Sequence, residues 1–243
     1  MVRKLSFGTA YVDGKPIDVG ANCYFNQRIY IGQSENGKKI NWVLQDGKLI
    51  ADRVLLRRIF WNQLINNDLV FGGTPILLDG QMFRCRILKI GPNGDEWSKA
   101  LQVKEMLVWA SEKERFFWVL ETDEKTHRLG RRNSFRPIMG PEDERPEDWL
   151  PVLEPMDPNY TALAKDNYLD ICSDEHILSG WLEDQTDYDL LIRPDPGKYI
   201  PIDLDRKVFS LEDDMFLVNK SGIRIVRKTD SPKKGGGVIC TAS

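Results

Sequence analysis

The stretch GRRNSFRPIMGPEDERPEDWLPVLEP runs from Gly130 to Pro155 and places arginines first, then prolines and acidic residues, then Trp-Leu-Pro. It follows neither the 3.6-residue period of a helix nor the two-residue alternation of a half-buried strand. Inside a compact domain, an irregular segment of this length is usually functional or belongs to an irregular fold. The segment therefore bears on the fold, and its arginines make it a candidate for ligand binding as well.

Upstream of this stretch, turn signals divide the chain into short segments rich in β-branched and aromatic residues, such as TAYVD, RIYIGQ and INWVLQ. Asp-Gly and Asn-Gly pairs suit type I′ hairpin turns, because both central residues of that turn need positive φ. The pairs are Asp13-Gly14, Asn36-Gly37, Asp46-Gly47 and Asp79-Gly80. They predict antiparallel β-structure, and because two of them bracket INWVL, they predict a meander there.

Two segments have near-helical spacing of apolar residues, namely IFWNQLINNDL at Ile59–Leu69 and the segment Glu96–Val108. The second follows Asn-Gly-Asp, which is typical of a helix N-terminus. RFFWVLE, at Arg115–Glu121, is apolar enough for a buried strand. The predicted fold class is therefore α+β and β-rich, with antiparallel hairpins and two short helices.

The C-terminal part is predicted to be a separate small β-rich domain over residues 166–228, after a linker at Asp157–Lys165. DYDLLIRPDPGKYIPIDL predicts two strands with a turn at Pro194–Gly197. FSLEDDMFLVNKSGIRIVRK predicts another pair with a turn at Asn219–Gly222. Residues 229–243 are glycine-rich at the end and are expected to form a flexible tail.

Composition excludes several classes of protein. The formal net charge of −3 and the 29% of charged residues argue against a globally basic nucleic-acid binder. No apolar run approaches the roughly 20 residues that span a bilayer, so no membrane partner is expected. The N-terminal residues have no apolar segment typical of a secretory signal, which favours a cytoplasmic or virion-associated location.

Metal and cofactor sites have little support in the sequence. The histidines are His127 and His176, about fifty positions apart, so the chain has neither HExxH nor a three-histidine set. The acidic runs do not match the spacing of an EF-hand loop, and they are expected to be solvated. Neither GxxxxGK[ST] nor GxGxxG after a strand occurs. We expect no metal and no cofactor.

A nucleophilic pair is conceivable at Cys172 and His176, in DICSDEH. On a helix this spacing would place both side chains on one face, so that the imidazole could activate the thiol. The competing interpretation is a buried cysteine beside a partly exposed histidine, since free cysteine is among the most buried residue types. The same argument predicts buried free thiols at Cys23 and Cys85.

Arg128, Arg131, Arg132 and Arg136 form the densest local positive charge of the chain. Guanidinium groups bind phosphate or carboxylate by paired hydrogen bonds, so this cluster is a candidate ligand site. The acidic run Glu142–Asp148 could instead neutralise the cluster internally. Nucleic-acid binding through the cluster is less favoured, because the chain has no matching basic stripe elsewhere.

Tryptophans crowd the middle third of the chain, and two of them lie beside irregular segments. If Trp109 and Trp149 are exposed next to polar loops, they would make a sugar-binding or protein-binding surface. The competing interpretation is burial in the core, which we favour for Trp97 and Trp118.

NSFRPIM followed by WLPVLEP resembles the closing motifs of formylglycine-generating-enzyme-like domains, a branch of the C-type-lectin fold. Further similar segments precede them in the family's order, namely FWNQLINNDLVFGG (Phe60–Gly73), DGQMFRCRILKIG (Asp79–Gly91) and GDEW (Gly94–Trp97). Ser134 stands where the family has glycine, and Leu150 stands where relatives have arginine. The resemblance covers about residues 53–156. It implies an irregular C-type-lectin-like core there, with GRRNSF and DWLPVLEP as its closing strands and the prolines and acidic residues in the loop between them. The turn signals predict a β-rich region before it, at residues 1–52.

The resemblance brings no catalytic residue with it. Oxidising members of the family use a cysteine pair with copper, the iron-dependent members use three histidines, and this chain matches neither set. The first hypothesis is therefore a non-enzymatic binding module for a protein or carbohydrate, in a phage or bacterial-surface context like that of such relatives. The alternatives are a thiol- or arginine-assisted hydrolase and a nucleic-acid-binding protein.

Overall fold

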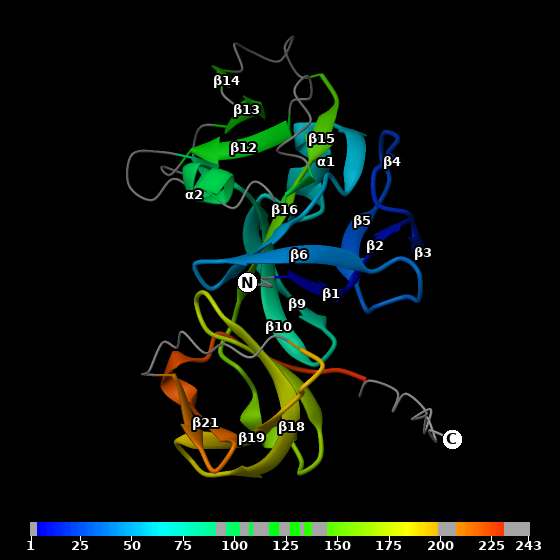
Figure 1. Ribbon diagram of the computed structural model, residues 1–243. Coiled ribbons are helices and arrows are strands. Elements are labelled where there is room, and N and C mark those ends of the chain that lie inside the picture. Colours follow the sequence, from blue (N-terminus) through cyan, green and yellow to red (C-terminus); the bar gives the residue numbers. More distant parts are fainter. Residues whose placement is uncertain are drawn as a thin grey trace, which may run out of the picture.

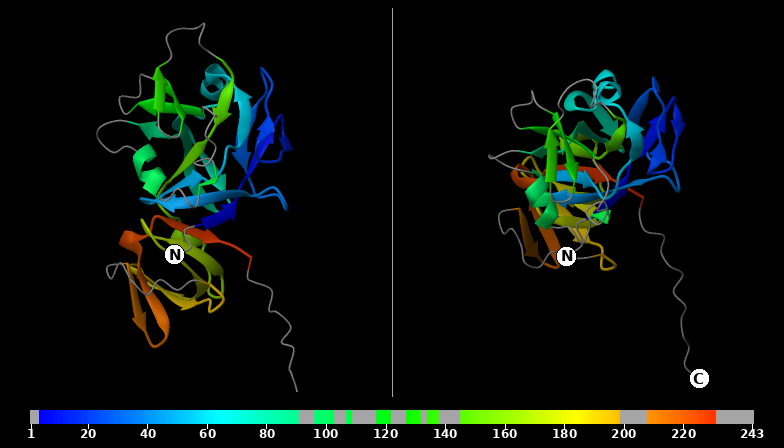
Figure 2. Two further views of the ribbon diagram at one scale, coloured as in Figure 1. Left: turned by 45° about the horizontal axis from the view of Figure 1, so that its top comes forward. Right: turned by 90° about the horizontal axis from the view of Figure 1, so that it is seen from above.

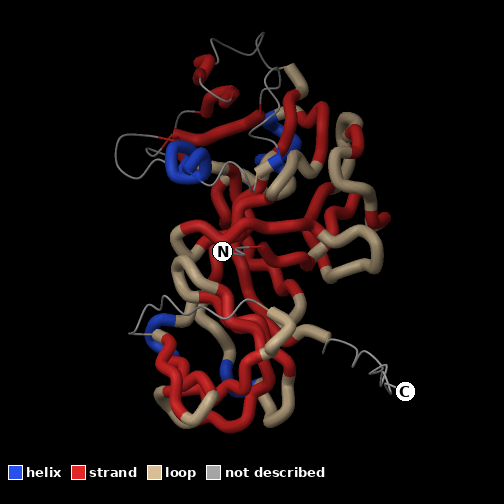
Figure 3. The backbone as a smooth tube through the Cα atoms, in the orientation of Figure 1, coloured by secondary structure: helices blue, strands red, loops and turns tan. Residues whose placement is uncertain are grey.

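The computed structural model describes residues 4–90, 96–102, 107–108, 117–121, 127–131, 134–137, 145–198 and 208–230. Strands dominate these residues (Figure 3). Most of the strand pairs are antiparallel, and the parallel ones join β11 (Lys89–Ile90) to β12 (Phe117–Glu121), β12 to β15 (Glu147–Trp149), and β4 (Ala21–Asn22) to β8 (Leu56–Ile59). The predicted β-rich character is confirmed. The first predicted helix is α1 (Trp61–Asn66), and the second begins as predicted in α2 (Glu96–Gln102). No helix in the described ranges is long and apolar enough to cross a membrane.

A central sheet holds the N-terminal part together (Figure 1). Val152 pairs with Ile50 on one side, and Leu153 pairs with Cys85 on the other, so the strand of WLPVLEP lies in the middle of this sheet. Because strands from both sides of residue 52 hydrogen bond here, the regions 1–52 and 53–156 share one sheet. The strand order is β1 (Lys4–Phe7), β6 (Ile40–Gln45), β7 (Lys48–Ala51), β16 (Pro151–Pro155), β10 (Gln81–Ile87) and β9 (Phe71–Leu78).

A second sheet contains the strand that directly precedes β16 in the chain. Leu150 separates β15 from β16, and the two strands pair in different sheets, which confirms DWLPVLEP as a strand-forming segment. The order in the second sheet is β14 (Ser134–Pro137), β13 (His127–Arg131), β12 (Phe117–Glu121), β15 (Glu147–Trp149), β8 (Leu56–Ile59) and β4 (Ala21–Asn22), with β11 (Lys89–Ile90) beside β12. A small third sheet consists of β3 (Lys15–Pro16), β2 (Thr9–Val12) and β5 (Ile29–Gly32).

The predicted Asp-Gly turns form as expected. Asp13, Asp46 and Asp79 all have φ near +50°, and each is followed by a glycine that also has positive φ, at the turns of β2–β3, β6–β7 and β9–β10. The Asn36-Gly37 pair also forms a turn, in which the Lys38 N–H donates to the Glu35 carbonyl over 3.1 Å, but the hairpin predicted there is wrong. Only Gly37 has positive φ there, and β5 and β6 belong to different sheets, so INWVLQ pairs with β1 and β7 instead of forming a meander with RIYIGQ.

The C-terminal sheet has the order β20 (Phe209–Glu212), β21 (Met215–Asn219), β19 (Asp189–Pro194), β18 (Ile177–Gln185), β17 (Tyr168–Cys172) and β22 (Ile225–Lys228). Its last hairpin turns at Asp213–Asp214. The chain does turn at Asn219–Gly222 as predicted, but the strands on either side, β21 and β22, do not pair with each other, so the hairpin predicted there is wrong. The Asn219 side chain accepts a hydrogen bond from Ser221 N and caps the 3-10 turn η5 (Lys220–Gly222), which directs the chain to β17. The predicted linker contains a similar turn, η4 (Tyr160–Ala162). Residues 199–207 and the tail from 231 lie outside the described part.

The C-terminal sheet lies below the central sheet in Figure 1, and Figure 2 shows the same arrangement from other directions. It has its own core, around Phe209 and Phe216. Cys172, Ile177 and Ile225 nevertheless pack into the larger core of the N-terminal part. The two parts therefore meet through apolar side chains as well as polar bonds. The cysteines Cys23, Cys85 and Cys172 are buried and free, as predicted.

Candidate functional site

Of the two tryptophans proposed for ligand binding, the structure describes Trp149. Trp149 is fully buried, with 0% of its surface exposed, so its ring is not available to an external ligand. The core interpretation therefore holds for Trp149, because β15 lies between β8 and β12 and is covered on both faces. Trp118 is buried as predicted, and its Nε1 donates to the Ile59 carbonyl over 2.8 Å. Trp109 and the side chain of Trp97 lie outside the described residues.

The arginine cluster is placed by its backbone alone. Arg128 and Arg131 lie on β13, and Arg136 lies on β14, where it pairs with Leu129 in an antiparallel hairpin. This topology brings the two segments side by side at one edge of the second sheet. Their side chains and Arg132 lie outside what the structure describes, so ligand binding and internal neutralisation both stay predictions.

Cys172 and His176 lie at a β-hairpin, so the helix that would give them a common face does not form. Cys172 ends β17 and pairs with Ile177, and His176 lies in the turn before β18. Burial raises the pKa of the Cys172 thiol far above its usual range. An activated nucleophile needs the opposite shift, because the thiolate is the reactive form. Within the described residues, no group of three or more His, Cys, Asp or Glu side chains could hold a metal ion.

A different surface has the chemistry of a binding site. The loop from Cys23 to Arg28 joins β4 to β5 (Figure 1). It presents Tyr24 and Phe25, which are 71% and 66% exposed. The Phe25 ring meets the Phe60 ring edge-on, with centroids 5.7 Å apart. We call Tyr24, Phe25, Arg28, Arg58 and Phe60 the aromatic–arginine surface.

The β2–β3 turn holds one side of this loop. The Asp13 carboxylate accepts hydrogen bonds from Gln27 Nε2 over 3.0 Å and from the Arg28 backbone N–H over 2.9 Å. Gln27 Oε1 accepts in turn from the Tyr24 N–H over 2.8 Å. The left-handed φ of +62° at Asn26 closes the bend between them. The backbone that carries the two exposed rings is therefore fixed by its own side chains.

Helix α1 holds the other side of the loop. Gln63 Nε2 donates to the Tyr24 carbonyl over 2.7 Å, and Asn67 Oδ1 accepts from the Ile29 N–H over 2.9 Å. The sequence IFWNQLINNDL therefore places the side-chain amides of Gln63 and Asn67 where they hydrogen bond to backbone groups about forty residues earlier in the chain. These bonds keep the loop ordered although its aromatic side chains have little cover.

The arginines of this surface come from the loop and from β8. Cys23 N donates to the Arg57 carbonyl, which joins the start of the loop to that strand. Arg58 has φ of +63°, in a region that costs energy for a long side chain and that is common at functional positions. Arg28 and Arg58 are exposed, and neither forms an ion pair within the described part of the chain. The Arg28 guanidinium lies 5.6 Å from the centre of the Tyr30 ring. The surface therefore combines exposed rings with two arginines that form no ion pair within the described residues.

Sequence reasoning missed this surface. Its only local signal is two consecutive aromatics in the polar segment CYFNQR, which a buried strand could also contain. Comparisons of the chain with protein-family models, with curated proteins and with solved structures found no match. The functional inference therefore depends on the geometry of the chain itself.

Proposed function

We propose that this chain is a non-enzymatic binding module that recognises a protein partner through the aromatic–arginine surface. The observation that supports it most directly is the exposure of Tyr24 and Phe25, 71% and 66%, on a loop whose backbone is hydrogen bonded on both sides. Exposed apolar groups of this size gain free energy when a partner covers them. A loop that is already ordered loses little conformational entropy on binding.

The composition of the surface favours a protein over a carbohydrate. Tyrosine, phenylalanine and arginine are enriched in protein interfaces, and tyrosine and arginine are common among residues that dominate binding energy. A sugar site also needs polar side chains that are free to bond to hydroxyl groups. Here Asp13, Gln27 and Gln63 are used to hold the loop. The rings of Phe25 and Phe60 stand at 88° to each other and form no flat platform.

The positive charge specifies the partner further. Arg28 and Arg58 would meet carboxylates on a complementary surface, which raises association rates and selects against basic partners. The expected partner is a protein segment with an apolar side chain flanked by acidic residues. A C-type-lectin-like core and a cytoplasmic or virion-associated location stay predictions beside this proposal.

The test uses a random peptide library displayed on phage, selected against the immobilised chain. We expect enriched peptides that combine acidic residues with a large apolar residue. Affinity for a purified peptide should fall at least ten-fold in the double variant Tyr24→Ser, Phe25→Ser, which corresponds to about 1.4 kcal/mol. The matched control is Tyr188→Ser, which removes a 76% exposed aromatic in the C-terminal part and should leave affinity unchanged.

Circular dichroism confirms that each variant is folded before binding is measured. Equal affinity of the peptides for the wild type and the double variant would overturn the proposal. So would specific binding to a glycan microarray that the double variant loses, because the surface would then recognise a carbohydrate.

A further inference from the structure

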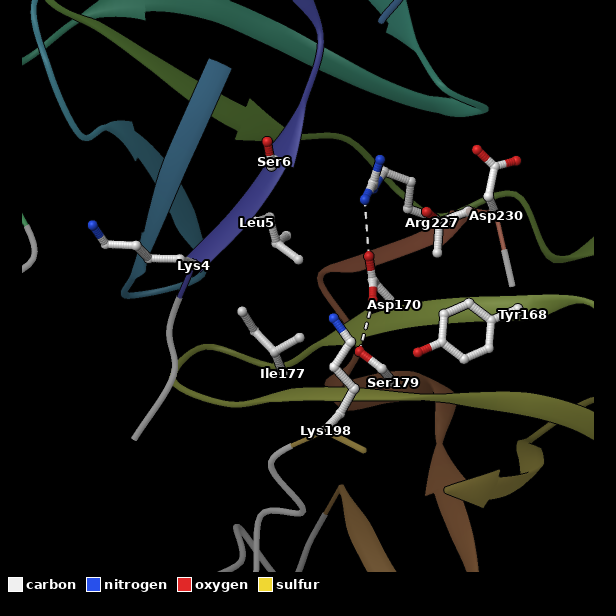
Figure 4. Close-up of a pocket in the computed structure, with 11 residues that line it drawn as sticks. Lys4, Leu5, Ser6, Tyr168, Asp170, Ile177, Ser179, Lys198, Arg227 and Asp230 are labelled. Carbon is white, nitrogen blue, oxygen red and sulfur yellow. Dashed lines mark hydrogen bonds and ion pairs between the residues drawn. The ribbon is translucent and has the colours of Figure 1, made fainter. Parts of the chain in front are cut away.

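A second site, separate from the aromatic–arginine surface, lies where the two parts of the molecule meet. A cleft of about 320 Å³ opens between β1 and the strands β17, β18 and β22 (Figure 4). Its walls include Lys4 from the N-terminal part and Tyr168, Asp170, Ser179 and Arg227 from the C-terminal part. A cleft of this volume suits a small ligand such as a monosaccharide.

A buried polar network forms the floor of the cleft. Arg227, only 4% exposed, donates to Asp170 over 2.8 Å and to Asp79 over 3.2 Å, and its guanidinium lies 4.4 Å from the centre of the Phe7 ring. Asp170 also accepts from Ser179 Oγ over 2.7 Å. One guanidinium therefore pairs with two carboxylates, and the floor keeps one negative charge that Arg227 does not offset.

One donor of this network has no partner. Arg227 Nε is buried and forms no hydrogen bond with any described residue. A buried N–H without an acceptor costs free energy and is uncommon in folded proteins. Ser179 Oγ donates its hydrogen to Asp170, and its lone pairs can accept a hydrogen bond from a further donor. The floor can therefore still accept from a ligand hydroxyl at Ser179 Oγ. Arg227 Nε is enclosed by protein atoms, so Arg227, which lines the cleft, attracts an anion by its charge and not through that N–H.

The rim of the cleft is positively charged. Lys198 extends to the cleft on the side of Asp170 opposite Arg227 (Figure 4). Lys39 and Lys228 line an adjoining hollow that shares Arg227 and Asp230 with the cleft. Within the described residues, none of these three lysines forms an ion pair. Against these three lysines stand Asp230 on the rim and the one negative charge that Arg227 leaves on the floor, so positive charge is in excess among the described residues.

We propose that this junction cleft binds a small hydroxylated anion, such as a sugar acid or a sugar phosphate. The anionic group lies within reach of Lys198 and Arg227, and neighbouring hydroxyls donate to Ser179 Oγ. The shared chemistry is one anionic group flanked by hydroxyls, and the cleft holds it by charge and by hydrogen bonds together.

Isothermal titration of the full chain tests this with four defined probes: glucuronate, glucose 6-phosphate, neutral glucose and inorganic phosphate. We expect glucuronate, glucose 6-phosphate or both to bind at least ten-fold more tightly than glucose and than inorganic phosphate. The stronger of the two identifies carboxylate or phosphate as the preferred group. Affinity should fall as salt rises, because exposed lysines contribute.

Lys198→Gln should lower the affinity for the better probe at least five-fold. Ser179→Ala should lower the ratio of the affinity for that charged sugar to the affinity for inorganic phosphate. Lys15→Gln, an exposed lysine on β3, is the matched control and should change nothing. Binding of glucose as tight as that of the charged sugars, no binding of any probe, or full binding by Lys198→Gln would each overturn the proposal. The Tyr24→Ser, Phe25→Ser variant should bind the probe normally, so this result is independent of the peptide experiment.

Discussion

At the scale of single residues, Arg86 of β10 is a buried charge that needs charged partners, since it is only 2% exposed. Its guanidinium makes two hydrogen bonds to the Glu96 carboxylate, over 2.8 and 2.6 Å, and one to Glu154 over 3.3 Å. Glu96 also accepts from Lys48 Nζ over 2.7 Å and from the Lys89 N–H over 3.0 Å. The cluster ties the start of α2 to the central sheet. Removing one partner of a buried pair costs more than the pair itself contributes, because it leaves an uncompensated charge.

Burial alone would raise the pKa of Glu96, but the hydrogen bonds and charge of Arg86, with those of Lys48, lower it from 4.5 to about 2. The folded-state pKa lies below the unfolded one, so this stabilisation is present above about pH 4.5 and is lost as the pH falls toward 2. We expect Glu96→Gln to lower the free energy of unfolding at pH 7 by about 3 kcal/mol and to flatten its pH dependence in that window. Urea unfolding at a series of pH values measures both.

Glu154→Gln is the matched control, because its carboxylate also contacts Arg86 but its side chain is 41% exposed. It should cost less than about 1 kcal/mol and keep the acid dependence, as expected for a screened surface pair. If the Glu96 variant loses stability on acidification as the wild type does, Glu96 is not the group that titrates.

At the scale of elements, turn chemistry explains the hairpins. Three of them turn at Asp-Gly, but β20 and β21 turn at Asp213–Asp214, where both residues have positive φ, +47° and +60°. Aspartate tolerates this region better than most residues, yet glycine adopts it without steric cost. The aspartate pair therefore holds a type I′-like geometry that its second residue does not favour.

Asp214→Gly should raise the free energy of unfolding by about 0.5 kcal/mol, because the relief of left-handed strain outweighs the added entropy of the unfolded chain. Asp187→Gly, in the β18–β19 turn, is the control. Asp187 has no positive φ, so glycine there adds entropy to the unfolded chain without relieving strain. The Asp187→Gly variant should therefore have a lower free energy of unfolding than the wild type. Denaturation midpoints of the two variants should move in opposite directions, and a shift of both in the same direction would contradict the explanation.

At the scale of the whole molecule, Arg227 joins the two parts. It bonds to Asp170 within the C-terminal part and to Asp79 at the β9–β10 turn, and the Ser34 hydroxyl donates to the same Asp79 carboxylate over 2.6 Å. Beside it, the Val226 N–H donates to Gln81 Oε1 over 3.4 Å. With the apolar contacts of Cys172 and Ile225, these bonds make the junction part of the folded core.

Arg227→Met should therefore destabilise by about 3 kcal/mol or more, since Asp170 stays buried without its cation. For the Arg227→Met variant, we expect calorimetry to show the C-terminal part melting at a lower temperature than the N-terminal part. Arg224→Met is the control, because its ion pair with Asp174 is about half exposed on both sides and should contribute little. A single transition unchanged in the Arg227 variant would show that the apolar contacts alone join the two parts.

Sequence alone determined the features that depend on neighbouring residues. The Asp-Gly hairpins and helix α1 follow from turn chemistry and periodicity, and the strand over Phe117–Glu121 follows from its apolar run; all three signals act over a few residues. Tertiary structure alone decided which strands pair over long separations. That pairing sends β15 and β16 to different sheets and returns β22 to β17. It also decided that Trp149 is covered and that Tyr24 and Phe25 are not. The physical reason is that every aromatic side chain gains free energy from burial, and only the packing of distant elements determines which aromatic side chains become buried.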